Sequence, residues 1–191
     1  MIGAAGPILP REFYTRPTLE VAPELLGKFL VHEMGGQRRA GKIVEIEAYI
    51  GQDDQACHCR VGRTARTWPM FGPGGHAYVY LIYGMYHLIN VVTETEGQPA
   101  SLLIRALEPG EGVVGRTNGP GRLCAALGID RSLSGHDLLQ PPLVVEDRGE
   151  RPARIATTPR INVAYAGEWA NRPWRFVDAE SRSLSVRLPR S

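Results

Sequence analysis

The chain has 191 residues, of which 43% are hydrophobic and 22% are charged, as expected for one globular domain that needs no metal or disulfide to support its core. Its 22 basic and 20 acidic residues leave a net charge of only +2, so charge by itself does not indicate a nucleic-acid partner. No apolar run approaches the roughly 20 residues of a membrane span, and the N-terminal sequence lacks the features of a signal peptide. These features predict a protein of a bacterial cytoplasm with no membrane partner.

The N-terminal segment is punctuated by prolines, and we expect residues 1–17 to form an extended arm of a single domain that spans residues 1–191. Thr18 is a candidate cap for a short helix that ends near Gly27, and Pro23 would interrupt or restart that helix.

Residues 28–34 and 39–49 predict two strands joined by a turn at residues 35–37. Within the second strand, apolar and polar side chains alternate, so that one face carries Val44, Ile46 and Ala48 and the other carries Glu45, Glu47 and Tyr49. A solvated strand face explains the polar set. Because the strand runs into a long loop, where catalytic groups are often placed, Glu47 is also a candidate general base or stabiliser of positive charge.

The loop at residues 51–75 contains Cys57, His58 and Cys59 in succession. We expect no metal there, because structural zinc sites use cysteines two to four residues apart with a second ligand pair elsewhere. The two cysteines are also too close in sequence for an ordinary disulfide, so the chain is expected to be reduced. His58 is a candidate for binding a base or handling a proton, or it is merely solvated.

Three arginines, Arg60, Arg63 and Arg66, follow in the same loop. They are candidate phosphate ligands, and the alternative is a solvated face. Basic residues throughout the chain are almost all arginine, which GC-rich coding also explains. Aromatic residues nearby favour nucleic acid, because stacking surfaces and basic groups then lie together.

Residues 78–90 (YVYLIYGMYHLIN) predict a strand, a turn at Gly84 and a second strand. The tip carries Tyr83 and Met85 instead of the small polar residues typical of turns. Such a tip either folds back onto the core or inserts into a partner such as a base step of DNA.

The rest of the chain predicts a strand at residues 101–107, a helix at 119–128, strands at 143–146 and 161–164, and a final aromatic segment from Glu168. The mixture is α+β, with short and mostly antiparallel strands. The sequence contains no P-loop, dinucleotide-binding glycine motif, nucleophile elbow or zincin motif, which argues against a nucleotide cofactor, a serine hydrolase or a zinc protease.

Taken together, five segments resemble the alkyladenine (3-methyladenine) DNA glycosylase family at the family's order and spacing. They are residues 43–49 (IVEIEAY), 78–86 with Asn90, 103–109 (LIRALEP), 119–124 (GPGRLC) and 166–169 (AGEW). The resemblance implies a curved, open-barrel-like antiparallel sheet with short surrounding helices and a protruding aromatic hairpin. It also implies a monomeric, monofunctional enzyme without a cofactor, which flips damaged purines out of duplex DNA and hydrolyses their N-glycosidic bonds.

The resemblance also assigns site residues. Glu47 and Arg105 match the catalytic carboxylate and the arginine that helps to orient the attacking water. The base-binding pocket corresponds to Tyr49, His58, Tyr80 and Asn90, the intercalating tip to Tyr83 and Met85, and the possible phosphate contacts to Arg60, Arg63, Arg66 and Arg122.

The sequence departs from the family at several positions. Cysteines flank His58 where the family has small or hydroxyl residues, Pro23 interrupts a helix, and Arg122 replaces a common lysine. The alternative function is a nucleic-acid-binding module without catalysis, by analogy with related open-barrel folds. The carboxylate face around Glu47 argues against this alternative, because a module that binds only phosphates needs no carboxylate there.

Overall fold

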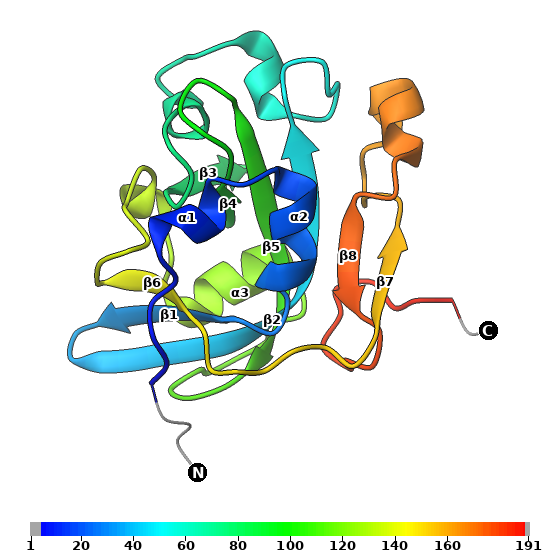
Figure 1. The fold of residues 1–191 in the computed structure, drawn as a ribbon. Coiled ribbons are helices and arrows are strands. Elements are labelled where there is room, and N and C mark those ends of the chain that lie inside the picture. Colours follow the sequence, from blue (N-terminus) through cyan, green and yellow to red (C-terminus); the bar gives the residue numbers. More distant parts are fainter. Residues whose placement is uncertain (1–4, 190–191) are drawn as a thin grey trace.

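The structure is a computed structural model that describes residues 5–189. In that range it forms one antiparallel sheet of eight strands, with the order β3-β4-β5-β2-β1-β6; β8 pairs with β2 as well, and β7 pairs with β8. The strands are β1 (Phe29–Met34), β2 (Gln37–Ile50), β3 (Ala77–Ile82), β4 (Tyr86–Val92), β5 (Ala100–Pro109), β6 (Leu143–Glu146), β7 (Ile155–Thr158) and β8 (Arg175–Asp178). The predicted α+β class with a curled antiparallel half-barrel is confirmed (Figure 1).

The helices are short and lie around the sheet (Figure 1). The α-helices are α1 (Arg11–Tyr14), α2 (Thr18–Leu25) and α3 (Pro120–Leu127). The 3₁₀ helices are η1 (His58–Val61), η2 (Trp68–Phe71), η3 (Arg131–Leu133) and η4 (Ala164–Asn171). The helix α3 follows its sequence closely, because Pro120 occupies its first turn and Gly128 ends it with a φ of +72° that glycine adopts without strain.

β2 is the organising strand of the molecule. Its first part pairs with β1, its second part pairs with β5, and the segment around Glu47 pairs with β8 on the opposite edge. Glu47 therefore lies opposite Leu103 of β5 and opposite Arg175 of β8. A site on β2 is thus held from both sides by backbone hydrogen bonds, which makes it rigid.

The predicted alternation along β2 is wrong at Val44. The register between β2 and β5 shifts on either side of Glu45, which marks a β-bulge. Val44 packs with Val177 of β8 and Leu184 on the outer side of the sheet, and does not join Ile46 in the main core. A bulge places two residues opposite one and so disturbs the alternation that an unbroken strand would show.

The main core lies between the sheet and the helices. The buried side chains of α2 and α3 meet those of β2 and β5, including Leu25, Leu127, Ile46 and Ile104. The other side of β2, which carries Glu47, is free of this core and meets the segment around Ile161, Ala166 of η4 and the C-terminal segment around Ser185 instead.

The N-terminal arm is only partly extended. Residues 1–4 of the expected arm lie outside the described residues, while residues 11–14 form α1 and bury Tyr14 completely. Pro23 does not interrupt α2, which continues to Leu25, and Thr18 is the first helical residue instead of its cap. Glu94 accepts hydrogen bonds from both the backbone N–H and the hydroxyl of Thr18, so a distant residue takes the capping role.

The strand expected at residues 161–164 is also wrong. Asn162 has a φ of +59°, which an extended strand cannot contain. The strand in this part of the chain is β7, which starts at Ile155, before the expected segment. The N–H of Ile161 donates to the carboxylate of Glu47 and not to a neighbouring strand. A site contact therefore overrides the local strand preference of the sequence.

Candidate active site

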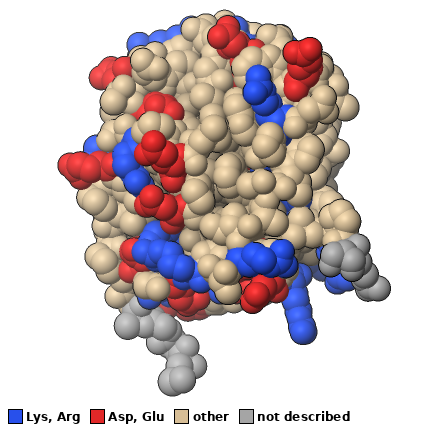
Figure 2. Space-filling model, turned by 45° about the vertical axis from the view of Figure 1, so that its right-hand side comes forward, with Lys and Arg blue, Asp and Glu red and all other residues tan. Residues whose placement is uncertain are grey.

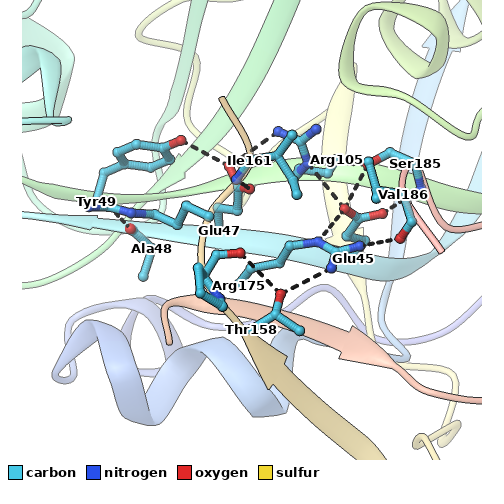
Figure 3. Close-up of polar contacts among 12 residues, drawn as sticks. Glu45, Glu47, Ala48, Tyr49, Arg105, Thr158, Ile161, Arg175, Ser185 and Val186 are labelled. Atoms are coloured by element: carbon cyan, nitrogen blue, oxygen red, sulfur yellow. Dashed lines mark hydrogen bonds and ion pairs between the residues drawn. The ribbon is translucent and has the colours of Figure 1, made fainter. Parts of the chain in front are cut away.

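Glu47 is the centre of a hydrogen-bonded cluster on the outer side of β2 (Figure 3). Its side chain is completely buried, contrary to a solvated strand face. The Oε1 atom accepts from the backbone N–H of Ile161 at 2.6 Å. The Oε2 atom accepts from the Tyr49 hydroxyl at 2.9 Å and from the Arg105 guanidinium at 3.2 Å. Three donors from three segments thus fix the orientation of this carboxylate.

Glu45 supports the cluster from the next outward-facing position. It is also completely buried, and it pairs with Arg105 at 3.1 Å and with Arg175 at 2.8 Å. It also accepts from the backbone N–H and hydroxyl of Ser185, at 2.6 and 2.7 Å. Arg105 therefore bridges two buried carboxylates, and Glu45 holds this arginine against Glu47 (Figure 3).

Burial raises the pKa of Glu47 above the ordinary glutamate value. The nearby Arg105 charge, the Ile161 N–H and the Tyr49 hydroxyl act in the opposite direction, and the Glu45 charge reinforces the rise. A carboxylate with a raised pKa that stays hydrogen-bonded in its charged form is suited to accept a proton.

A cavity of about 390 Å³ lies beside the cluster, a volume in the range of small-molecule sites. Arg105 and Ile161 form part of its wall, which links the cavity to Glu47. All four residues of the predicted base pocket line it, together with one tip residue, and these are Tyr49, His58, Tyr80, Asn90 and Tyr83. Asn90 is buried, and its side-chain amide donates to the backbone carbonyl of Tyr78 at 3.1 Å, which fixes the amide.

His58 lies edge-on to Tyr80, with ring centroids 4.5 Å apart. Its Nδ1 atom lies 3.0 Å from the Tyr78 hydroxyl. Burial and the nearby Arg66 and Arg60 lower the pKa of His58 to about 4. His58 is therefore neutral near pH 7 and adds an aromatic surface to the cavity without a positive charge.

The expectation for Cys57 and Cys59 is contradicted, because the structure joins them in a disulfide. Their Cα atoms are 5.3 Å apart, a normal separation for a disulfide. The start of η1 at His58 curls the chain enough to allow this pairing across a single intervening residue. Sequence separation alone did not show this local turn.

Tyr49 is held by residues that the sequence did not indicate. Arg160 and Asp54 form a completely buried ion pair, with contacts of 2.6 and 2.9 Å. The Arg160 guanidinium lies over the Tyr49 ring, 4.7 Å from its centroid, and 5.1 Å from the centroid of Trp174. This stack fixes the plane of Tyr49, which lines the cavity, while its hydroxyl contacts Glu47. Arg160 lies more than 100 residues from Asp54 and Tyr49, so no local motif could reveal its contacts with them.

The hairpin tip protrudes from the fold. Tyr83 is 83% exposed and Met85 is 66% exposed, so the alternative of a tip folded onto the core is wrong. Tyr83 has a φ of +53°, which is unfavourable for a residue with a bulky side chain, and Gly84 follows at +68°. Tyr83 also borders the cavity, so the most exposed part of the hairpin adjoins its mouth.

The four candidate phosphate contacts have different surroundings, although all are exposed. Arg66 lies over Tyr80, 5.3 Å from the ring centroid, and its guanidinium is 3.4 Å from Nε2 of His58. Arg122, at the start of α3, donates to the side chain of Asn118. Arg60 and Arg63 lie on the surface of the same loop as Arg66. Arg66 thus contacts two residues that line the cavity, Tyr80 and His58, while remaining exposed itself.

Across residues 5–189, no three or more His, Cys, Asp or Glu side chains gather in a way that could hold a metal ion. None of the helices in the same part of the chain is long and apolar enough to cross a membrane.

Comparison with known proteins gives a consistent result. Residues 12–182 match the family model described as methylpurine-DNA glycosylase. A protein of Methanocella arvoryzae is 52% identical, with 96% of this chain and 98% of the relative covered. A protein of Anaeromyxobacter sp. (strain Fw109-5) is 57% identical, with 95% of this chain and 93% of the relative covered. A protein of Legionella pneumophila (strain Corby) is 54% identical, with 93% of this chain and 97% of the relative covered. Each relative carries the name "Putative 3-methyladenine DNA glycosylase".

Proposed function

Because the chain belongs to the methylpurine-DNA glycosylase family and is a DNA glycosylase of base excision repair, we propose that Glu47 and the adjoining cavity form its active site. A damaged purine flips out of duplex DNA into the cavity, and its N-glycosidic bond is hydrolysed there to leave an abasic site. The observation that carries the proposal is the buried Glu47 carboxylate, held by three donors beside a cavity with aromatic walls.

The aromatic walls suit the leaving base. A purine alkylated at N3 or N7 is positively charged, and the faces of Tyr49 and Tyr80 attract a cation more than a neutral ring. His58 supports this preference, because its low pKa keeps it uncharged and so it does not repel the base. The charge also makes the base a better leaving group, so that less chemistry is required of the protein.

Glu47 acts as the general base toward the attacking water. An ionised carboxylate offers about four acceptor positions, and Ile161, Tyr49 and Arg105 occupy three of them. The remaining position accepts a hydrogen bond from the water that attacks C1′. The same negative charge stabilises the oxocarbenium-like sugar of the transition state, and Arg105 orients both Glu47 and the water.

Residues outside the Glu47 cluster hold the DNA and select the base. Tyr83 at the exposed tip fills the space that the flipped base leaves, with Met85 beside it. The fixed amide of Asn90 lies beside the 2-position of the purine and disfavours the exocyclic amine of guanine, an effect on the order of 1–3 kcal/mol. Arg60, Arg63, Arg66 and Arg122 contact phosphates. The enzyme acts as a cytoplasmic monomer and uses no cofactor.

The experiment is single-turnover excision from duplex oligonucleotides that carry hypoxanthine or ethenoadenine opposite thymine. Wild type should produce alkali-labile sites, and Glu47→Gln should lower the rate by about 10²- to 10⁴-fold, as the loss of a general base predicts. Glu47→Gln should still bind the same duplexes in a mobility-shift assay, which controls for misfolding. Full excision by Glu47→Gln would refute the assignment, and lesion-independent binding without excision by wild type would favour a binding module.

A further inference from the structure

Ser101 has the one buried hydroxyl in the wall of the cavity that lacks a hydrogen-bond partner among the described residues. The residue is only 1% exposed, its Oγ atom has no partner in residues 5–189, and it lines the cavity. Buried side-chain polar atoms are paired in the large majority of cases, and an unpaired one costs about 1–3 kcal/mol. A buried hydroxyl that faces a cavity is therefore a candidate ligand contact.

The position of Ser101 on β5 shows which part of a ligand it would meet. Ser101, Leu103 and Arg105 all line the cavity from alternate positions of the strand. Ser101 lies opposite Tyr49, and Leu103 lies opposite Glu47. Four residues of strand, about 13 Å between Cα atoms, separate Ser101 from Arg105. Ser101 thus lies one alternate position beyond Leu103, the residue opposite Glu47, on the side away from Arg105.

We propose that Ser101 is a specificity-determining residue whose hydroxyl hydrogen-bonds to the exocyclic oxygen or amino group at C6 of the flipped purine. The inference rests on the proposed function, which places C1′ of the sugar near Glu47. The sugar is attached at N9, and the C6 side of a purine lies away from N9. A base that lies along β5 with N9 toward Arg105 therefore directs C6 toward Ser101.

A hydroxyl suits more than one damaged base at this position. It donates to an oxygen, as in hypoxanthine or 7-methylguanine, and accepts from an amino group, as in 3-methyladenine, because its hydrogen rotates freely. Ser101 therefore selects for a polar group at C6 without distinguishing an oxygen from an amine. A purine with only hydrogen at C6 would leave the hydroxyl unpaired and lose this contribution.

The test compares single-turnover excision of hypoxanthine and of unsubstituted purine from the same duplex sequence, by wild type and by Ser101→Ala. Loss of one hydrogen bond should slow hypoxanthine excision by about three- to tenfold, while purine excision should change less than twofold. If purine is removed too slowly to time, its duplex is used as a competitor of hypoxanthine excision, and Ser101→Ala should leave its inhibition constant unchanged.

Thr117→Val is the matched control, because Thr117 is also buried but its hydroxyl donates to the carbonyl of Leu107 at 2.6 Å, outside the cavity. This variant should lower the melting temperature and leave the ratio of the two excision rates unchanged. Ser101→Ala should change the ratio and leave the melting temperature equal or higher, since it removes an unpaired buried hydroxyl.

Equal effects of Ser101→Ala on both bases, or no effect on either, would overturn the role of Ser101 while leaving the proposed function intact. Wild type that prefers purine over hypoxanthine would overturn it as well. Wild type that removes neither base and does not bind either duplex would instead contradict the proposed function. The two failures are therefore distinguishable.

Discussion

The protonation state of Glu47 connects its surroundings to the rate of the reaction. Burial raises its pKa, and the Tyr49 hydroxyl lowers that pKa by hydrogen-bonding to the charged form. A general base must be ionised, so excision should be lost as the pH falls through this raised pKa. The acid limb of the pH–rate profile for hypoxanthine, a neutral base, should then lie above the value of about 4.3 for an ordinary glutamate.

Tyr49→Phe tests the cause of this limb. The variant removes a hydrogen bond that lowers the Glu47 pKa, so the limb should move to higher pH. Single-turnover rates measured from pH 4 to 8 for both proteins give the comparison. A limb that moves to lower pH, or that stays in place, would show that a group other than Glu47 controls it.

Glu45 is expected to contribute to stability more than any exposed glutamate. Glu45→Ala would leave Arg105 and Arg175 buried without their shared carboxylate, and breaking such a buried pair costs about 3–5 kcal/mol. Glu33→Ala is the matched control, because the Glu33 side chain is half exposed and lies 3.6 Å from Arg38, so its loss should cost less than about 1 kcal/mol. Urea denaturation measures both free energies of unfolding, and equal values would contradict the supporting role of Glu45.

Individual site residues were predictable where they belong to one short pattern. The alternation on β2 placed Glu47 and Tyr49 on one side, and the bulge at Val44 did not disturb that part of the strand. The groups that fix these side chains were not predictable, because Ile161, Arg160 and Ser185 approach from distant parts of the chain. Burial of Glu45 and Glu47 follows from that coverage, which is why a solvated face was the simpler expectation.

At the scale of elements, the hairpin β3–β4 combines strain with exposure. Tyr83 has positive φ, which costs a residue with a side chain about 1–2 kcal/mol, and it is the most exposed aromatic residue of the tip. Tyr83→Gly should therefore raise the free energy of unfolding by up to about 1 kcal/mol while weakening excision at least tenfold, because the group that fills the DNA stack is lost. Tyr83→Asn should also raise the free energy of unfolding and weaken excision, because asparagine tolerates positive φ as well. Lower stability in both variants would contradict the strain at Tyr83.

Elements with their own boundary residues were predicted well. The β3–β4 hairpin turns at Gly84, α3 begins at Pro120 and ends before Gly128, and β6 is a short apolar run. Each of these signals is local in the sequence. The failures share a long-range cause. The first helix forms around the buried Tyr14, and the expected strand at residues 161–164 is replaced by a turn that delivers the Ile161 N–H to Glu47. Tertiary contacts, not local propensity, decide both segments.

At the scale of the whole molecule, charge is distributed without a dominant patch on the face seen in Figure 2. Acidic and basic side chains lie intermixed around a broad area that is mostly uncharged. The net charge of only +2 argues against attraction to DNA by the overall field. Binding should instead depend on a few local arginines, and each phosphate contact should contribute about one unit to the slope of log affinity against log salt concentration.

Substitution of Arg63 and of Arg66 distinguishes phosphate binding from recognition of the damaged base. Arg63→Ala should reduce the slope of log affinity against log salt concentration by about one. It should weaken binding to damaged and undamaged duplexes equally, because a phosphate contact carries no information about the base. Arg66→Ala should in addition reduce the preference for the lesion, because Arg66 contacts Tyr80 and His58 in the wall of the cavity. Fluorescence anisotropy titrations at several salt concentrations measure both quantities. Identical behaviour of the two variants would mean that Arg66 acts only on phosphate and that the pocket keeps its shape without it.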